Sequence, residues 1–496
     1  MAFALSARER RCLAWFVIAV VVVRLATLGA YPLMDTTESR YAEIARKMLE
    51  SGNWLMPQFD YGLPFWGKPP LSTWLSALSM AAFGVNEFAA RLPSTVMVAS
   101  CGALVYAVAT VRGGRDQALW TLALFASTAM VFVAAGAVMT DPALMLGTTL
   151  SMAGFWIAVH GPERRRRLAG CAFFAGLAVG LLAKGPIAVV LVLVPTGASA
   201  LWSRSLRSAW QRLPWLSGFL LTLVLAGAWY WAAERVTPGF LEYFLVGEHW
   251  KRFVEPGWAG DRYGRAHTTA PGTIWLLWIV AALPWSIAAL VALALAARAR
   301  SGAWRAFAAD PWLVYCALWA VTPMAFFTPA GNILVTYVLP GLPAFALLVG
   351  ESWRPDRGDK GRLPEQAALR SPVIQTVVAG AVLPLVFAAA VVMLRGSLEA
   401  ERSQKALVRG YDSLRPRADS KLVYYLERPD SAQFYTQGRS LKVLDWTAFH
   451  SRLDEAPSDT FAIREREMGG MPPGDRARLE VIANYGAYLL LREVRR

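Results

Sequence analysis

Two carboxylates and an arginine lie close together just after the first apolar run: Asp35, Glu38 and Arg40. Lys68 follows further along, at the edge of another apolar stretch. Acids and bases placed where a hydrophobic segment meets water suggest chemistry on a phosphate carried by a lipid. A carboxylate can act as a general base or orient an incoming nucleophile. A lysine or arginine can stabilise the charge that develops on a leaving phosphate. The residues therefore favour Asp35 or Glu38 as the catalytic acid group and Lys68 and Arg40 as ligands of the donor phosphate.

Each of these side chains also has a purely structural interpretation. Asp35 could cap a helix, and Glu38 is favourably placed near a helix N-terminus. Lys68 could extend its ammonium group toward lipid headgroups. The residue types alone leave both interpretations open.

Two further candidates lie at the edges of later apolar runs. Asp141 precedes Pro142 at the start of a predicted span, where it could cap the helix or bind a sugar hydroxyl or an amine. Lys184 lies between two short hydrophobic segments. A lysine near the membrane midplane is costly and usually has a functional or ion-paired reason.

The polar segment 234–271 contains Glu248, His249 and Arg252, followed by His267. A Glu/His set could bind zinc, but no third close ligand stands at metal spacing. We therefore expect no metal site and no required cofactor, although a divalent metal is compatible with the residue types. Contact of His249 and Arg252 with a phosphate or sugar is the favoured interpretation.

The elements that position these residues follow from composition. The chain has 496 residues, of which 56% are hydrophobic and 17% charged, whereas soluble proteins carry about 25% charged residues. Apolar stretches near the length needed to cross a bilayer recur, and the first has no cleavage pattern. The four cysteines have neither metal spacing nor a disulfide pattern. Spans are predicted at 13–33, 94–111, 117–134, 142–160, 168–183, 186–202, 214–233, 272–297, 312–328, 335–351 and 373–394.

The net charge of +15 would suggest nucleic-acid binding in a soluble protein. Here the basic residues gather in short loops between apolar runs, so the positive-inside rule accounts for them and no nucleic acid is expected. The basic loops are Arg8–Arg11, Arg112–Arg115, Arg164–Arg167, Arg204–Arg212, Arg298–Arg305 and Arg354–Arg370. With these loops and the N-terminus in the cytoplasm, every candidate site residue falls on the opposite side.

The outer segments have predicted structure of their own. The first outer loop, 34–93, should contain a helix over 40–51 that is capped by Thr37 or Ser39, ends at Gly52 and lies on the membrane surface through Ile44 and Met48. A second interfacial helix is expected over 71–83. Residues 395–496 change character and predict a small α/β periplasmic domain beside a transmembrane catalytic domain over 1–394. Its expected strands are Leu422–Leu426, Leu441–Leu444, Thr460–Ile463 and Tyr488–Leu491.

These motifs together resemble the bacterial ArnT-like glycosyltransferases, members of the GT-C, protein-mannosyltransferase-like superfamily. The resemblance covers nearly all of the membrane part, and the first-loop motifs are the most specific. The matching residues are Asp35, Glu38, Arg40-Tyr41-Ala42-Glu43-Ile44-Ala45, Gly52-Asn53-Trp54, Lys68-Pro69-Pro70-Leu71, Phe88–Ser94, Asp141-Pro142, Ala183-Lys184-Gly185, Glu248-His249, Arg252-Phe253, Ala270-Pro271 and Thr336-Tyr337-x-Leu339-Pro340.

The resemblance implies an all-α polytopic membrane fold with about 11–13 transmembrane helices plus interfacial helices. It also implies an inverting enzyme of the bacterial inner membrane that uses a polyprenyl-phosphate sugar on the periplasmic face. Its best-known members move an aminosugar from undecaprenyl phosphate to a lipid A phosphate. Tyr41, His267 and Tyr337, with Glu248, Asp141 and Lys184, would then line the substrate cavity of a monomer.

Some positions depart from the family pattern. Thr37 stands where an aspartate is usual, and residues 330–335 lack the lysines of the lipid A enzymes. A polyprenyl-phosphate hexose donor with a protein or glycan acceptor therefore stays open. A lipid flippase or transporter is the alternative from another class, but transporters tend to show internal symmetry and no tandem repeat is found here.

Overall fold

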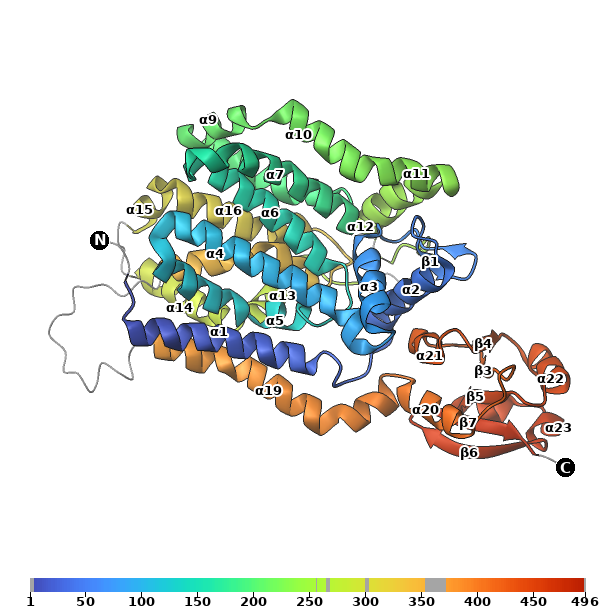
Figure 1. Cartoon of the computed structure of the whole chain (residues 1–496). Coiled ribbons are helices and arrows are strands. Elements are labelled where there is room, and N and C mark those ends of the chain that lie inside the picture. The colour runs from blue at the N-terminus through green and yellow to red at the C-terminus, as the bar shows by residue number, and fades with distance from the viewer. Residues whose placement is uncertain (1–3, 256, 265–267, 299–302, 353–371, 495–496) are drawn as a thin grey trace. The chain divides into compact units, whose positions relative to one another are not determined.

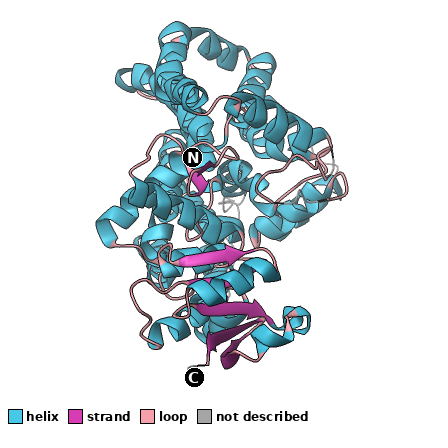
Figure 2. Ribbon diagram, turned by 90° about the vertical axis from the view of Figure 1, so that its right-hand side faces the viewer, coloured by secondary structure: helices cyan, strands magenta, loops and turns pink. Residues whose placement is uncertain are grey.

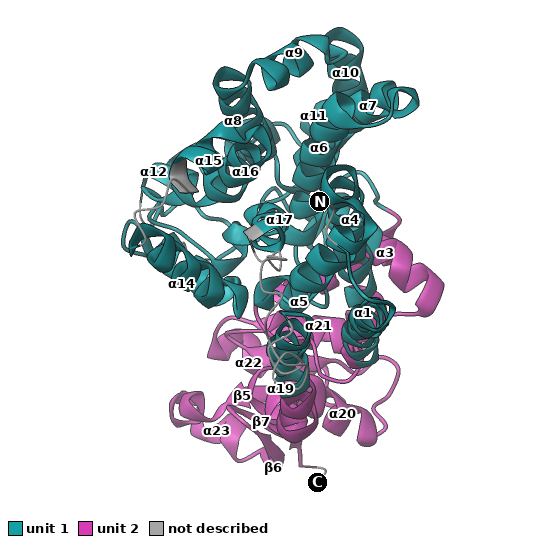
Figure 3. Ribbon diagram, turned by 90° about the vertical axis from the view of Figure 1, so that its left-hand side faces the viewer, with its two compact units in different colours: residues 1–26, 53–75, 91–387 teal, residues 27–52, 76–90, 388–496 magenta. Residues whose placement is uncertain are grey.

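The computed structural model describes residues 4–255, 257–264, 268–298, 303–352 and 372–494. His267 and the basic stretch 354–370 lie outside the described residues. The chain forms two compact units, shown in different colours in Figure 3: residues 1–26, 53–75 and 91–387 form unit 1, and residues 27–52, 76–90 and 388–496 form unit 2. Each unit is described by itself. The division by function at residue 394 stays a prediction.

Unit 1 is a helical bundle (Figure 1). Five helices of the described residues are long and apolar enough to cross a membrane, or six if the bent pair α13–α14 counts as one span. The chain is thus a multi-pass membrane protein, as its composition predicts. Its elements are α1 (Ala7–Thr27), β1 (Gln58–Asp60), β2 (Leu63–Pro64), α3 (Leu71–Phe83, ending in unit 2), α4 (Glu87–Ala126, beginning in unit 2), α5 (Ala129–Ala134), α6 (Asp141–His160), α7 (Glu163–Lys184), α8 (Ile187–Trp202), α9 (Arg204–Arg212), α10 (Trp215–Thr222), η1 (Leu223–Gly227), α11 (Ala228–Val236), η2 (Glu242–Lys251), α12 (Arg252–Val254), α13 (Thr273–Ala281), α14 (Trp285–Arg298), α15 (Ala303–Ala309), α16 (Pro311–Phe327), η3 (Val335–Gly341), α17 (Leu342–Ser352) and α19 (Pro372–Glu401, ending in unit 2).

Several predicted spans are not continuous helices. The predicted span 272–297 is two helices bent by 112° around Pro284, because proline cannot continue the helical hydrogen bonds. The predicted span 335–351 starts as the 3₁₀ helix η3, which contains Pro340. The predicted span 117–134 breaks between α4 and α5, where the hydroxyls of Ser127 and Thr128 bond back to helix carbonyls.

Small residues bring α6 and α7 into close contact. A Cβ atom added at Gly147 of α6 would lie 2.5 Å from the backbone nitrogen of Gly180 on α7. The Ser151 hydroxyl donates to the carbonyl of Phe173 at 2.7 Å. Small side chains and interhelical hydrogen bonds are the usual means of helix association in a membrane, where no hydrophobic driving force acts between helices. This pair carries Asp141 at the start of α6 and Lys184 at the end of α7.

Polar contacts join several of the predicted cytoplasmic loops. These contacts connect the segments around residues 10, 112–116, 202, 308–310 and 351, all within unit 1. They are Arg10 to Asp116 at 2.8 Å, Arg112 to Asp310 at 2.5 Å and to Glu351 at 3.1 Å, and the Trp202 indole to the carbonyl of Ala308 at 3.0 Å. Loops that the charge pattern assigns to one side of the membrane are therefore neighbours in space.

Unit 2 contains a mixed five-stranded sheet in the order β4-β3-β5-β7-β6 (Figure 2). Strand β3 pairs in parallel with β4 and β5, whereas β7 is antiparallel to both β5 and β6. The four predicted strands are confirmed, and β6 is an additional one. The elements of unit 2 are α2 (Thr37–Ser51), α20 (Lys405–Ser413), β3 (Leu422–Tyr425), α21 (Asp430–Thr436), β4 (Ser440–Val443), α22 (Trp446–Glu455), β5 (Thr460–Arg464), η4 (Glu465–Gly470), α23 (Pro473–Arg476), β6 (Leu479–Tyr485) and β7 (Tyr488–Glu493).

Alternation along β3 builds a core on each face of this sheet, since successive side chains of a strand point to opposite faces. Leu422 and Tyr424 pack in one cluster with residues of α20 and α21. Val423 and Tyr425 pack in another with Phe449 of α22. The sheet is therefore covered on both faces by helices of the same unit.

Helix α2 confirms one sequence expectation and corrects two. It ends at Gly52, which adopts the left-handed conformation that favours glycine. Its N-cap is Thr36 without a side-chain bond, not Thr37 or Ser39, because the Ser39 hydroxyl bonds to Asp35 instead. Ile44 and Met48 are buried, so this face of α2 packs inside the protein and does not lie on a membrane surface.

Candidate functional site

In unit 1, two cations share one buried carboxylate. The Lys68 ammonium lies 3.0 Å from Oε2 of Glu248, and Nη1 of Arg252 lies 2.9 Å from the same oxygen. Arg252 also pairs with Asp261 at 3.4 Å. The Tyr243 hydroxyl donates to the other oxygen of Glu248 at 3.2 Å. Lys68 thus meets two predicted site residues that lie far along the chain, Glu248 and Arg252, in one cluster, which we call the Glu248 cluster.

Exposure distinguishes the members of the Glu248 cluster. The Glu248 side chain is 2% exposed, whereas those of Lys68 and Arg252 are 19% and 24% exposed. Burial favours the neutral form of Glu248, but the charges of Lys68 and Arg252 prevail and hold its pKa below the ordinary value. The carboxylate is therefore ionised and lies behind the two cations, whose outer sides remain accessible to an anion.

The loop that carries Lys68 is fixed by aromatic side chains. The Tyr263 hydroxyl donates to the carbonyl of Pro64 at 2.8 Å and accepts from the backbone nitrogen of Trp66 at 3.0 Å. The Trp66 indole donates to the Thr237 hydroxyl at 3.2 Å. Segments 58–68 and 237–263 are thereby joined, which positions the ammonium group of Lys68 before any ligand arrives.

A second pair lies at the helix ends of unit 1. The Lys184 ammonium is 2.5 Å from Oδ1 of Asp141 and 4.2 Å from the ring centre of Tyr337. Asp141 is thus the ion partner that an intramembrane lysine requires. Gly185, at φ +84°, follows, and a Cβ there would lie 2.7 Å from the Phe244 ring. Only glycine allows η2 to approach the end of α7 this closely.

His249 connects the Glu248 cluster to this pair. Its Nδ1 lies 2.7 Å from the carbonyl of Phe244, and its Nε2 lies 3.0 Å from the carbonyl of Lys184. Burial lowers the pKa of His249. The hydrogen bonds to the two carbonyls favour the protonated ring and oppose this shift. Both ring nitrogens therefore contact backbone. His249 ties η2 to the end of α7, and its predicted contact with substrate stays a prediction.

The Asp141–Lys184 pair gives a prediction about stability. Asp141→Ala should destabilise the protein by about 3–5 kcal/mol, since it leaves a largely buried charge without its partner. The double variant Asp141→Leu/Lys184→Met should recover most of that loss, because apolar residues can replace a buried pair. Thermal unfolding in detergent measures both variants. Equal destabilisation by the single and double variants would contradict a simple ion pair, and loss of transfer in a stable double variant would indicate a role with substrate.

In unit 2, Asp35 is a heavily hydrogen-bonded carboxylate. Oδ1 accepts from the Ser39 hydroxyl at 2.6 Å and from the Ser431 backbone at 2.9 Å, and Oδ2 accepts from the Ser431 hydroxyl. Burial raises the pKa of Asp35, although the bonds from Ser39 and Ser431 oppose the shift. Asp35 therefore caps the first turn of α21 from a distant part of the chain, the structural interpretation that the sequence left open.

Arg40 and Asp430 lie next to this carboxylate. Nε of Arg40 is 3.3 Å from Oδ2 of Asp430. Burial raises the pKa of Asp430 to about 6, with Arg40 lowering and Asp35 raising it. Glu38 makes a contact within its own segment: its Oε2 accepts a hydrogen bond from the Met34 backbone nitrogen at 3.2 Å. Tyr41 is half-buried on α2.

Comparison with known proteins identifies the fold. Residues 11–244 match the family model described as dolichyl-phosphate-mannose-protein mannosyltransferase. The crystal structure of ArnT from Cupriavidus metallidurans bound to undecaprenyl phosphate superposes with a TM-score of 0.77 at 19% identity, covering 96% of this chain and 97% of that one. The chain is similar to ArnT and shares its fold. The predicted fold class is confirmed.

Several proteins that are similar to this chain carry the name undecaprenyl phosphate-alpha-4-amino-4-deoxy-L-arabinose arabinosyl transferase. The protein of that name from Shewanella sediminis is 30% identical over 336 residues, which are 67% of this chain and 58% of the relative. Its namesake from Pseudomonas savastanoi pv. phaseolicola is 32% identical over 335 residues, 67% of this chain and 60% of the relative. The chain thus matches less than two thirds of the length of these relatives.

Sequence reasoning missed several partners of the predicted residues in this ArnT-like chain. In the segment 234–271, Asp261 and Tyr263 stand in the polar run Asp-Arg-Tyr, a signal that could have found them. Asp430 and Ser431 follow Pro429 after a predicted strand, which is typical of a helix start. Among the described residues, no group of three or more His, Cys, Asp or Glu side chains could hold a metal ion.

Proposed function

We propose that this chain is an inverting glycosyltransferase that moves an aminosugar from undecaprenyl phosphate to a lipid A phosphate. The names of its relatives support the donor and the sugar class. The ArnT crystal structure with undecaprenyl phosphate supports a lipid-phosphate ligand for this fold. The proposal places the enzyme in the bacterial inner membrane as a monomer, with the N-terminus cytoplasmic, the site and C-terminal domain periplasmic, and no required metal.

The single observation that carries the proposal is the Glu248 cluster. Lys68 and Arg252 present accessible positive charge on a buried carboxylate that fixes their positions. In the reaction, an acceptor oxygen attacks the anomeric carbon while the bond from that carbon to the phosphate oxygen breaks. The electron pair of the breaking bond stays on the leaving undecaprenyl phosphate. Two preorganised cations at that phosphate stabilise the charge as it develops.

Asp35 is the proposed group that positions the acceptor, with Glu38 as its alternate. An acceptor phosphate is already ionised near neutral pH, so it needs orientation and not deprotonation. Burial raises the pKa of Asp35, and the bonds from Ser39 and Ser431 fix the position of its carboxyl group. A carboxyl group held in this way can orient the acceptor, and Arg40 supplies a positive charge beside it.

The sugar would contact the second pair of unit 1. Asp141, with Tyr337 beside Lys184, offers a carboxylate and a hydroxyl to an amine or to sugar hydroxyls. A protein or glycan acceptor with a hexose donor is the second candidate. It is favoured by one observation, the absence of lysine from 330–335.

Mass spectrometry of lipid A tests the proposal. Cells with the gene should show a mass increment the size of an aminopentose or hexosamine, and cells without it should lose that increment. Complementation with the wild type, with Lys68→Ala and with the exposed control Lys251→Ala separates loss of chemistry from loss of protein. Unchanged lipid A in the deletion strain would reject the lipid A acceptor and direct the search to glycoprotein or other glycan acceptors.

A further inference from the structure

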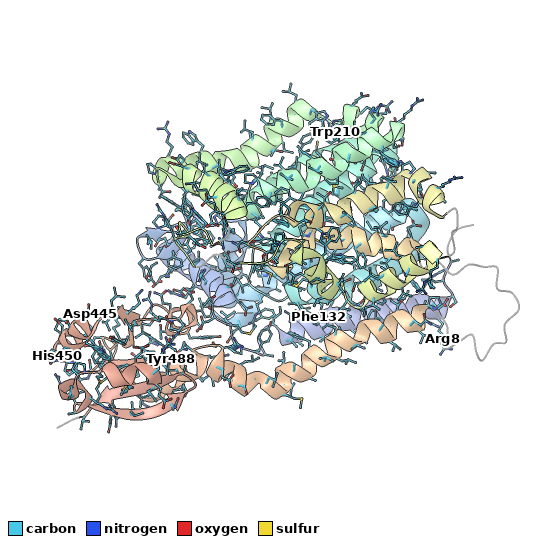
Figure 4. The ribbon with its side chains drawn as sticks, turned by 180° about the vertical axis from the view of Figure 1, so that it is seen from behind. Arg8, Phe132, Trp210, Asp445, His450 and Tyr488 are labelled. Carbon is cyan, nitrogen blue, oxygen red and sulfur yellow. The ribbon has the colours of Figure 1, made fainter. Side chains whose placement is uncertain are left out.

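A separate cavity lies at the other end of α7 from Lys184. It is an open cavity with a volume of about 510 Å³, lined by the end of α6, the start of α7, α9 and the start of α10, all in unit 1. Figure 4 labels Trp210 on α9, the helix that closes it. Arg166 lines the cavity in the second turn of α7, so at 1.5 Å per residue the helix separates it from Lys184 by about 27 Å. The cavity is therefore distinct from the candidate site.

Three arginines line this cavity: Arg166, Arg167 and Arg212. Across the described ranges, no carboxylate pairs with any of the three guanidinium groups. Nε of Arg166 donates a long hydrogen bond to the carbonyl of Gly161, at 3.4 Å. Serine hydroxyls of α9 and α10 add hydrogen-bond donors to the lining. The cavity thus collects positive charge and donors without an internal anion to balance them.

The remaining wall and the neighbouring surface are apolar. Val159, Leu213 and Pro214 line the interior. Beside the cavity, Leu168 of α7 and Leu216 of α10 are 73% and 78% exposed, as side chains that face lipid are. A ligand that fits must carry an anionic head and an apolar body. A soluble phosphate would use only the arginines and leave the apolar wall without a partner.

We propose that this cavity binds an anionic phospholipid of the surrounding membrane, its phosphate held by the three arginines and its acyl chains along α7 and α10. Guanidinium groups bind phosphate oxygens through paired N–H donors. Basic pockets between membrane helices are suited to acidic lipid headgroups. The volume lies within the usual range of ligand pockets, about 300–1,000 Å³.

Native mass spectrometry of the full chain in mild detergent tests this site, with phosphatidylglycerol and phosphatidylethanolamine as probes. The wild type should bind phosphatidylglycerol in preference. Arg166→Gln/Arg167→Gln/Arg212→Gln should weaken that binding on the order of a hundredfold. Each basic residue near the membrane surface contributes a similar share of the binding free energy, so the fold-changes in affinity multiply. The single variant Arg212→Gln, which is easier to keep folded, should weaken it on the order of fivefold.

Arg164→Gln/Arg165→Gln/Arg204→Gln is the matched control, because it removes the same charge from the same two helices outside the cavity lining. It should keep wild-type binding within about twofold. Equal weakening in the control would show general surface attraction and overturn the proposal. Equal binding of the two lipids, or displacement of phosphatidylglycerol by inorganic phosphate alone, would also overturn it, the latter in favour of a free anion.

Discussion

Lys68→Ala is expected to lower the rate of sugar transfer on the order of 10²–10³-fold, the usual cost of removing one preorganised donor at a developing charge. Lys68 is one of two cations on Glu248, so its loss leaves Arg252 alone to stabilise the leaving phosphate. The loss should appear mainly in kcat, because the charge on that phosphate grows in the transition state. Transfer assayed with a defined polyprenyl-phosphate sugar measures it.

Two controls make this result interpretable. Lys251→Ala removes an exposed lysine next to the cluster and should leave the rate unchanged within about twofold, as surface substitutions usually do. Lys68→Arg keeps the charge and should retain part of the activity, although guanidinium and ammonium are not equivalent. Full activity in a folded Lys68→Ala protein would remove Lys68 from the site.

The second large effect is expected for Asp35→Asn, with a loss on the order of 10²–10⁴-fold in transfer. The substitution keeps the size of the side chain but removes the acid group. Asparagine can still accept from Ser39 and Ser431 through its amide oxygen, so part of the capping of α21 survives. A thermal unfolding midpoint close to that of the wild type would confirm that chemistry, and not folding, was lost.

Ser431→Ala separates the two roles of Asp35. It removes the hydroxyl bond to Oδ2 but keeps the backbone bond to Oδ1 and the carboxyl group itself. If Asp35 positions the acceptor, Ser431→Ala should stay active while Asp35→Asn does not. Equal loss of stability and activity in both variants would instead assign Asp35 a purely structural role, and Glu38→Gln would then be the next variant to measure.

The sequence predicts the helical membrane part and the strands of the small sheet because both depend on local patterns. Apolar length marks a span, and short β-rich runs such as Leu422–Leu426 mark strands. Interruptions of spans are harder to predict. Pro284 bends a predicted span by 112°, whereas Pro93 lies inside the unbroken first part of α4, which is interrupted only later, at Gly114. Proline identity alone does not distinguish these outcomes, since neighbouring helices decide whether a freed backbone group is satisfied.

The contacts within the candidate site are also only partly predictable from the sequence. The charge pattern places Lys68, Glu248 and Arg252 on one side of the membrane, and the structure brings them into contact. The charge pattern alone could not show that Lys68 and Arg252 share one oxygen of Glu248, or that Asp261 pairs with Arg252, because such pairing depends on tertiary packing. Nor could it show that both nitrogens of His249 face backbone carbonyls.

Glu248 also bears on how quickly such an enzyme can let its product go. In the proposed reaction the donor is a phosphodiester with one negative charge, whereas the polyprenyl phosphate left behind is a monoester with a second ionisation near pH 6. Without Glu248, Lys68 and Arg252 would bind this more highly charged product more tightly than the donor. The Glu248 carboxylate, already bonded to Lys68 and Arg252, competes with the product for these two cations. Its presence therefore works against product inhibition and favours turnover.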